Sequence, residues 1–141
     1  MSNAAAIGLI LIVLGTWIRL MTFRHLGRLF RFEASIQKDH DLIVTGPYSV
    51  VRHPSYTGLI LIAGGLFHWH LSKGSWIMES GTWNTVLGRL LVVVYFSALI
   101  LSILFAVART TKEDIALRNQ FGEKWDDWAK RVPYSIFPGI Y

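Results

Sequence analysis

Three long stretches without a charged residue divide this chain, and they constrain its fold more than any other feature. They cover residues 1–18, 53–72 and 90–108. A helix needs about 20 apolar residues to cross a hydrocarbon core of about 30 Å. Only 16% of the residues are charged and 52% are hydrophobic, whereas soluble domains usually carry about 25% charged residues. We therefore predict an all-α integral membrane protein, with transmembrane helices at about 4–23, 55–72 and 87–108.

The three runs differ in quality. The third, rich in Leu, Val, Ile and Phe, gives the clearest span. The second is diluted by Gly64, Gly65, His68 and His70, so we expect a short or tilted helix packed through its glycines. A cleaved signal peptide is the alternative for the first run. That run has no basic segment before it and no small-residue cleavage pattern after it, so a membrane span is favoured.

Charge placement predicts the orientation. Of the fourteen Lys and Arg residues, only Lys73 and Arg89 lie outside two segments, the 24–54 loop with its flanks and the 109–141 tail. The positive-inside rule puts both segments in the cytoplasm. The basic residues border apolar runs and form no patch, so we expect a lipid bilayer as partner and no nucleic acid. At this length residues 1–141 should form a single domain, and without cysteine it has no disulfide or thiolate chemistry.

The tail has the pattern of a C-terminal amphipathic helix. Thr110 and Glu113 have the spacing of a capping box, which predicts a helix start at Thr110. An apolar stripe follows at helical spacing, made of Phe121, Trp125, Trp128 and Val132. Gly122 is expected to kink or break this helix, and Pro133 to end it. The stripe could lie on the membrane surface or pack on the other helices.

One motif stands at the edge of the second run. Residues 46–58 read Gly-Pro-Tyr-Ser-Val-Val-Arg-His-Pro-Ser-Tyr-Thr-Gly. Charge and a missing backbone N–H both cost free energy beside hydrocarbon. A segment that only spanned lipid would therefore not be expected to carry Arg52 and Pro54 at its edge. The segment resembles the signature of the isoprenylcysteine carboxyl methyltransferase family, roughly Gly-x-Tyr followed by Arg-His-Pro-x-Tyr-x-Gly.

The tail extends this resemblance. Arg109, the acidic pair Glu113 and Asp114, the stretch Phe-Gly-Glu-Lys-Trp at 121–125 and Arg-Val-Pro at 131–133 are similar to the second half of the family pattern. Family members usually carry further membrane helices before the part that begins here. The resemblance therefore implies a short or N-terminally truncated member, whose two motifs lie on the same predicted membrane face.

The resemblance implies a pocket for S-adenosyl-L-methionine between the two cytoplasmic segments. It assigns cofactor contacts to Glu33 (by spacing only), His40, Asp41, Leu42, Ile43, Tyr48, His53, Pro54, Ser55, Tyr56 and Glu113. It assigns Arg109 to catalysis and to the substrate carboxylate, and it implies no metal. The implied substrates are prenylated protein C-termini or a small prenylcysteine. The implied location is an integral membrane position, in a eukaryote the endoplasmic reticulum.

Each assignment has a simpler alternative. Arg52 and Arg109 would also serve as membrane anchors, His53 could hydrogen-bond a loop carbonyl, and Glu113 could be only a capping residue. Other functions also stay open: a phospholipid or other small-lipid methyltransferase, a membrane sterol reductase, or a non-catalytic relative. Sterol reductases typically follow the shared Arg-His-Pro-x-Tyr stretch with Phe-Gly-Glu, where this chain has Thr-Gly-Leu at 57–59.

Overall fold

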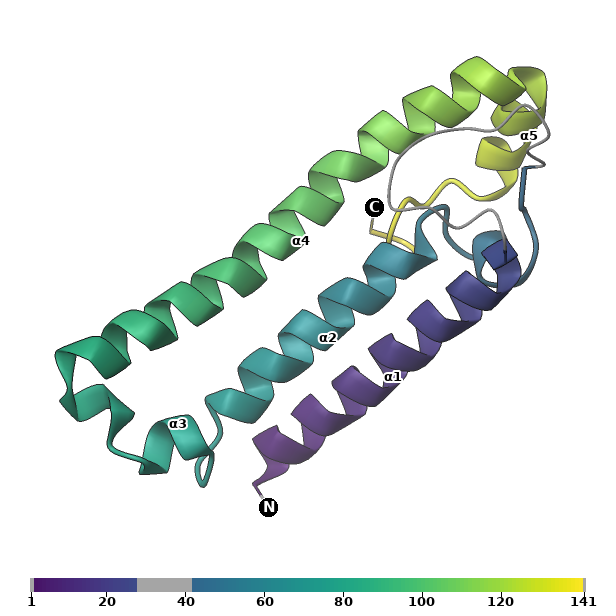
Figure 1. Cartoon of the computed structure of the whole chain (residues 1–141). Coiled ribbons are helices and arrows are strands. Elements are labelled where there is room, and N and C mark those ends of the chain that lie inside the picture. Colours follow the sequence, from purple (N-terminus) through teal and green to yellow (C-terminus); the bar gives the residue numbers. More distant parts are fainter. Residues whose placement is uncertain (1, 28–41, 141) are drawn as a thin grey trace. The chain divides into compact units, whose positions relative to one another are not determined.

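The computed structural model describes residues 2–27 and 42–140, and within these ranges the regular structure is entirely helical. The elements, shown in Figure 1, are α1 (Asn3–Leu26), η2 (Gly46–Ser49), α2 (Pro54–His70), α3 (Trp76–Glu79), η3 (Thr82–Asn84), α4 (Val86–Phe121) and α5 (Glu123–Arg131). The prediction of an all-α membrane fold is confirmed. The residues group into two compact units: Met1–Trp17 with Gly58–Phe105, called unit 1, and Ile18–Thr57 with Ala106–Tyr141, called unit 2.

Two helices of the described ranges are long and apolar enough to cross a membrane, α1 and α4. The most apolar windows of α1 and α4 are only 17% and 11% buried, so these helices do not resemble the core helices of a soluble protein. Large side chains such as Ile10 and Val94 are 64% and 65% exposed, as expected where lipid is the solvent. The α2 helix has 17 residues, and its crossing of the membrane remains a prediction.

Within unit 1, α1 and α2 pack antiparallel through glycines. A Cβ atom added to Gly8 would lie 2.7 Å from the carbonyl oxygen of Gly65, and one added to Gly15 would lie 2.5 Å from that of Gly58. Small residues allow such close backbone approach between membrane helices. The predicted glycine packing of α2 is therefore present. A Cβ atom added to Gly65 would lie 2.6 Å from the carbonyl oxygen of Gly8, whereas one added to Gly64 would have nothing within 4 Å.

Aromatic rings join α2 to α4 in the same unit. Phe67 stacks on Phe96 with ring centroids 4.8 Å apart, and His70 meets Tyr95 edge-on at 5.3 Å. Offset and edge-on pairs of this kind contribute about 0.5–1.5 kcal/mol beyond their buried area. His70 therefore has a packing role in α2. In the chain between these helices lie α3 and η3 (Figure 1).

Within unit 2, the prediction of a helix start at Thr110 is wrong. The α4 helix continues without a break to Phe121, and the Thr110 hydroxyl donates to the carbonyl of Val107, 2.8 Å away, as in a helix interior. Capping-box spacing is a local signal, and here it lies within a helix that had already begun. Glu113 therefore has no capping role.

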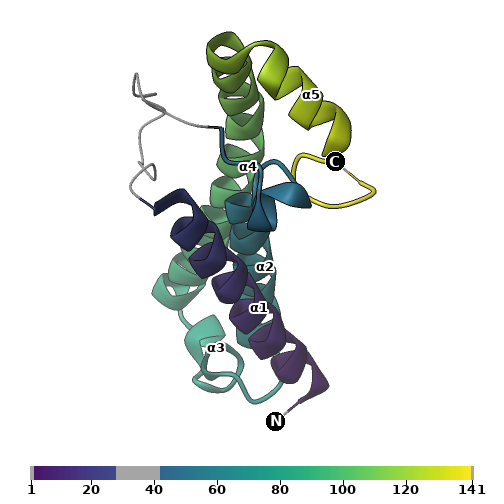
Figure 2. The same cartoon turned by 90° about the vertical axis from the view of Figure 1, so that its right-hand side faces the viewer.

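The predicted break at Gly122 is present. Gly122 has φ +54°, a left-handed conformation that glycine adopts at little cost, and the separate helix α5 follows it (Figure 2). The stripe of α5 is packed inside unit 2, because Trp128 is 2% and Val132 5% exposed. The Trp128 Nε1–H donates to the carbonyl of Tyr48 at 3.1 Å.

The C-terminal segment after α5 also packs within unit 2. Its Ile136 side chain is 2% exposed, and the Ile136 carbonyl accepts a 2.6 Å hydrogen bond from the Thr57 hydroxyl. The backbone N–H groups of Arg52 and His53 donate to the carbonyls of Tyr134 and Ser135, at 3.0 and 2.8 Å. This segment thereby ties the signature motif to the end of the chain.

Candidate functional site

Glu113 is the centre of a polar cluster that brings the two sequence motifs together. Its Oε1 atom accepts from Nε of Arg109 at 2.7 Å and from the hydroxyl of Tyr56 at 2.8 Å. Its Oε2 atom lies 3.4 Å from Nδ1 of His53. Arg109 is one helical turn before Glu113 on α4, whereas His53 and Tyr56 belong to the signature motif. All four residues lie in unit 2.

His53 lies between two carboxylates. Its Nε2 atom is 2.9 Å from Oδ1 of Asp114, opposite the contact with Glu113, and its side chain is only 5% exposed. Burial disfavours the charged ring, but the hydrogen bonds to Asp114 and Glu113 outweigh burial and raise the pKa of His53 above its usual value. The ring therefore does not bond a loop carbonyl, which was the simpler alternative.

The two tyrosines of the motif both interact with the cluster. Tyr56 is next to His53, with ring centroids 5.9 Å apart. Burial, followed by the negative charge of Glu113, raises the pKa of the Tyr48 hydroxyl, so this hydroxyl stays protonated at neutral pH. Two neutral aromatic rings thus lie near a carboxylate, an arrangement that favours cations.

Four further predicted cofactor residues lie in the signature motif or in the segment that precedes it. Pro54 is fully buried as the first residue of α2, where its missing N–H costs nothing. The Ser55 carbonyl accepts from Nη1 of Arg19 at 3.1 Å. Leu42 and Ile43 lie half-buried in the segment that leads into η2. Glu33, His40 and Asp41 lie outside the described residues.

Sequence reasoning missed two members of the cluster, Arg52 and Asp114. Nε and Nη2 of Arg52 lie 3.1 and 3.0 Å from Oδ2 of Asp114. From the sequence, Arg52 is a motif residue or a membrane anchor, and Asp114 is the second half of an acidic pair. The pair joins residues 62 positions apart, and no local spacing rule reports such a contact.

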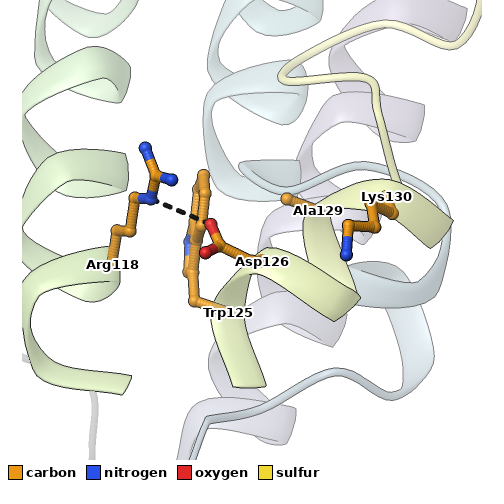
Figure 3. Close-up of a pocket in the computed structure, with 5 residues that line it drawn as sticks. All are labelled: Arg118, Trp125, Asp126, Ala129 and Lys130. Atoms are coloured by element: carbon orange, nitrogen blue, oxygen red, sulfur yellow. Dashed lines mark ion pairs between the residues drawn. The ribbon is translucent and has the colours of Figure 1, made fainter. Parts of the chain in front are cut away.

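A shallow cavity of about 450 Å³ lies elsewhere in unit 2 (Figure 3). It is lined by Arg118, Trp125, Asp126, Ala129 and Lys130. Nε of Arg118 pairs with Oδ1 of Asp126 at 2.8 Å, and the guanidinium lies over the Trp125 ring, 5.9 Å from its centroid. None of the predicted site residues that the structure describes lines this cavity, so it is distinct from the Glu113 cluster.

Comparison with known proteins agrees with the motifs. Residues 7–70 match the sequence model described as the isoprenylcysteine carboxyl methyltransferase family. The protein-S-isoprenylcysteine O-methyltransferases of Rattus norvegicus and Mus musculus are 33% and 34% identical to this chain over 134 residues. Each match covers 94% of this chain.

A relative named for a different reaction, the reduction of a sterol, also matches the chain. The Delta(14)-sterol reductase of Mus musculus is 32% identical over 103 residues, which cover 71% of this chain and 20% of the reductase. The chain spans 40% and 41% of the rat and mouse methyltransferases. It therefore corresponds to less than half of each of these proteins.

No solved structure matches this chain. The matches to the rat and mouse methyltransferases cover both motifs and so include every member of the Glu113 cluster, whereas the family model covers the signature motif. They confirm the resemblance predicted from the sequence, and by these comparisons the chain is related over most of its length to the isoprenylcysteine carboxyl methyltransferase family.

Proposed function

We propose that this chain is a membrane methyltransferase that uses S-adenosyl-L-methionine to methylate the C-terminal carboxylate of a prenylated cysteine. The observation that carries the proposal is the Glu113 cluster, in which Arg109 and Glu113 of the tail meet His53 and Tyr56 of the signature. Rat and mouse proteins with this activity in their names are similar to the chain across both motifs.

The donor set of the cluster suits S-adenosyl-L-methionine. When bound, this cofactor supplies an electrophilic methyl group on a sulfonium. Its ammonium and ribose hydroxyls need an acceptor, and Glu113 is a half-buried carboxylate with a fixed orientation. The rings of Tyr48 and Tyr56 offer faces that favour a cation. His53 lies 3.4 Å from Oε2 of Glu113 and can hold this carboxylate in place for the cofactor.

Methylation of a carboxylate requires few catalytic groups from the protein. A C-terminal carboxylate has a pKa of about 3.5 and is ionised at neutral pH, so its methylation needs no general base. The protein has to hold one carboxylate oxygen at a near-attack distance of about 3–3.5 Å from the methyl group. Arg109 suits this role because its planar guanidinium can hold a carboxylate in a fixed orientation. The 2.7 Å bond to Glu113 fixes the guanidinium itself.

The membrane context fits a lipid-modified substrate. Arg109 follows directly on the apolar run of α4, so we propose that it lies at the cytoplasmic edge of the bilayer. A prenyl chain could remain in the hydrocarbon while its cysteine carboxylate reaches this edge. The proposed acceptors are prenylated protein C-termini or a small prenylcysteine, and in a eukaryote the proposed membrane is the endoplasmic reticulum.

Reduction of a sterol is the second candidate, favoured by the similarity to the mouse Delta(14)-sterol reductase. Against it stands the Thr-Gly-Leu stretch at 57–59, where the reductases typically carry Phe-Gly-Glu. In this structure Thr57 has a structural role, since its hydroxyl donates a hydrogen bond to the Ile136 carbonyl. A nicotinamide-dependent reaction therefore ranks behind methyl transfer.

Purified full-length chain in lipid nanodiscs separates these functions. Radiolabelled S-adenosyl-L-methionine would be offered with N-acetyl-farnesylcysteine, with phosphatidylethanolamine, or without acceptor. We expect label in a base-labile methyl ester of farnesylcysteine. Label only in the phospholipid would identify an amine methyltransferase. Failure to bind the labelled cofactor, together with binding of a reduced nicotinamide nucleotide, would favour the reductase.

A further inference from the structure

Asp114 contacts two consecutive residues of the signature motif with its two carboxylate oxygens. Oδ2 accepts from Nε and Nη2 of Arg52, at 3.1 and 3.0 Å, and Oδ1 is 2.9 Å from Nε2 of His53. The three side chains are 14%, 16% and 5% exposed, for Arg52, Asp114 and His53 respectively. Both carboxylate oxygens of Asp114 therefore accept hydrogen bonds from the protein, at a site that is largely shielded from water.

The other ring nitrogen of His53 faces a second carboxylate. Nδ1 lies 3.4 Å from Oε2 of Glu113. An ionised carboxylate only accepts hydrogen bonds, and a neutral imidazole has one N–H and one bare nitrogen. If the ring were neutral, a lone pair would point at a carboxylate oxygen. The geometry is satisfied when both nitrogens carry a proton, so that the ring is an imidazolium.

Arg52 ties this arrangement to the C-terminal segment. Its Nη1 atom donates to the carbonyl of Val132 at 3.1 Å and also to that of Pro133. One guanidinium thus holds the Asp114 carboxylate and the segment that follows α5. A simple membrane anchor would have its charge in water or among headgroups, whereas this one is committed to protein acceptors.

We propose that Asp114 is a positioning residue, which holds His53 protonated and aimed at Glu113 while Arg52 fixes the Asp114 carboxylate. The consequence for cofactor binding rests on the proposed function, because Glu113 is the residue assigned to the cofactor. The charge state of His53 does not depend on that assignment. A cationic His53 keeps Glu113 ionised and limits its rotation, so that Glu113 can receive a cationic ligand group without first reorganising.

The charged and titratable groups around His53 come from three elements. Asp114 and Glu113 face it from α4, Tyr56 from α2, and Arg52 from the motif itself. The C-terminal segment contributes the Ser135 carbonyl to the His53 backbone N–H. Asp114 and Glu113 are the two anions in this set, and removal of the Asp114 charge should therefore weaken proton binding at His53.

The test is a pH titration of the full chain in nanodiscs, with ¹⁵N-labelled histidine followed by NMR. The signal of His53 is identified by its absence from His53→Gln protein. In the unsubstituted protein we expect both His53 ring nitrogens to be protonated at pH 7. A neutral His53 at that pH would overturn the proposal, and the titration itself is made on the unsubstituted protein.

The variant Asp114→Asn gives the second measurement. We expect its His53 midpoint to fall by about one pH unit or more, roughly tenfold in proton affinity, while Asp114→Glu retains most of the affinity. Asp126→Asn is the matched control, since Asp126 pairs with Arg118 outside the cluster. An unchanged midpoint in folded Asp114→Asn, or an equal shift in the control, would assign Asp114 a merely structural role.

Cofactor binding separates this inference from the proposed function. With S-adenosyl-L-methionine as the probe, Asp114→Asn should bind about tenfold more weakly than the unsubstituted chain. If the unsubstituted chain does not bind this cofactor but His53 titrates as described, the proposed function fails and the positioning role stands. If it binds the cofactor but its His53 is neutral, the positioning role fails alone.

Discussion

Nε of Arg109 donates to Oε1 of Glu113 across 2.7 Å, one helical turn further along α4. The family resemblance assigns these residues to different ligands, the substrate carboxylate and the methyl-donor cofactor. The hydroxyl of Tyr56 bonds the same oxygen at 2.8 Å. The proposed substrate-binding and cofactor-binding residues are therefore joined through the Glu113 carboxylate. A substitution at Glu113 is expected to affect Arg109 as well.

Glu113→Gln tests the cofactor assignment. The amide keeps the size of the side chain but removes the negative charge, so we expect S-adenosyl-L-methionine to bind about ten- to a hundredfold more weakly. Calorimetry on the full chain in nanodiscs measures this affinity. Glu123→Gln is the control, because Glu123 is exposed in the first turn of α5. Equal affinity in both variants would leave Glu113 with a purely structural role.

The raised pKa of His53 predicts that the stability of the folded protein depends on pH. Its pKa is raised in the folded state by the hydrogen bonds to Asp114 and Glu113, against the effect of burial. The folded protein therefore binds this proton more tightly than the unfolded chain, in which the pKa is about 6.5. The stabilisation is complete below about pH 6.5 and is lost as the pH rises through the folded-state pKa.

Thermal unfolding in detergent from pH 6 to pH 9 measures this effect. The melting temperature of the unsubstituted chain should fall over this range more than that of His53→Gln. His68→Gln, which changes a histidine of α2 outside the cluster, should behave like the unsubstituted chain. Parallel curves for the unsubstituted chain and His53→Gln would contradict the raised pKa.

Two adjacent glycines of α2 provide a matched pair for helix packing. A Cβ atom at Gly65 would lie 2.6 Å from the carbonyl oxygen of Gly8, whereas one at Gly64 has nothing within 4 Å. Gly65→Ala should therefore force α1 and α2 apart and cost about 1–3 kcal/mol. Gly64→Ala should be neutral or stabilising by about 0.5–1 kcal/mol, since alanine is the better helix former. Unfolding in SDS mixed micelles compares them, and equal stabilities would contradict the glycine contact.

Glycosylation mapping tests the topology. The 73–85 connection carries few positive charges, so a glycosylation acceptor inserted there should face the lumen of microsomes and be modified. An acceptor appended after residue 141 should remain unmodified, because the tail is predicted to be cytoplasmic. Modification of the C-terminal acceptor would put the tail on the lumenal side and contradict the predicted orientation.

Much of the fold follows from the apolar runs. The first and third runs became α1 and α4, with starts within one residue of prediction. The sequence changes from apolar to charged after Ala108, which predicts a helix boundary there, but α4 continues to Phe121. Charged residues continue a helix readily, and Arg109 with Glu113 forms a stabilising i, i+4 pair within it.

The candidate site was predictable only in part. His53, Tyr56, Arg109 and Glu113 were predicted from their motifs, and the structure brings them together. The pairing of Arg109 with Glu113, and the role of Asp114, depend on side-chain directions and on contacts between distant residues. Burial and charge compensation in the folded state decide such contacts, and sequence spacing carries no information about them.

The most direct test of methyl transfer compares Arg109→Lys with the unsubstituted chain. Lysine keeps the positive charge but not the planar fork, and a small displacement from the near-attack position can cost about a hundredfold in rate. Arg118→Lys makes the same change on the same helix, where the side chain is 63% exposed.

The measurement is the rate of methyl transfer to N-acetyl-farnesylcysteine at saturating S-adenosyl-L-methionine. We predict an active unsubstituted chain, an unchanged Arg118→Lys variant, and a rate about a hundredfold lower in Arg109→Lys. A near-normal rate in Arg109→Lys would remove Arg109 from the site. No transfer to farnesylcysteine by cofactor-bound unsubstituted protein would contradict carboxyl methylation itself.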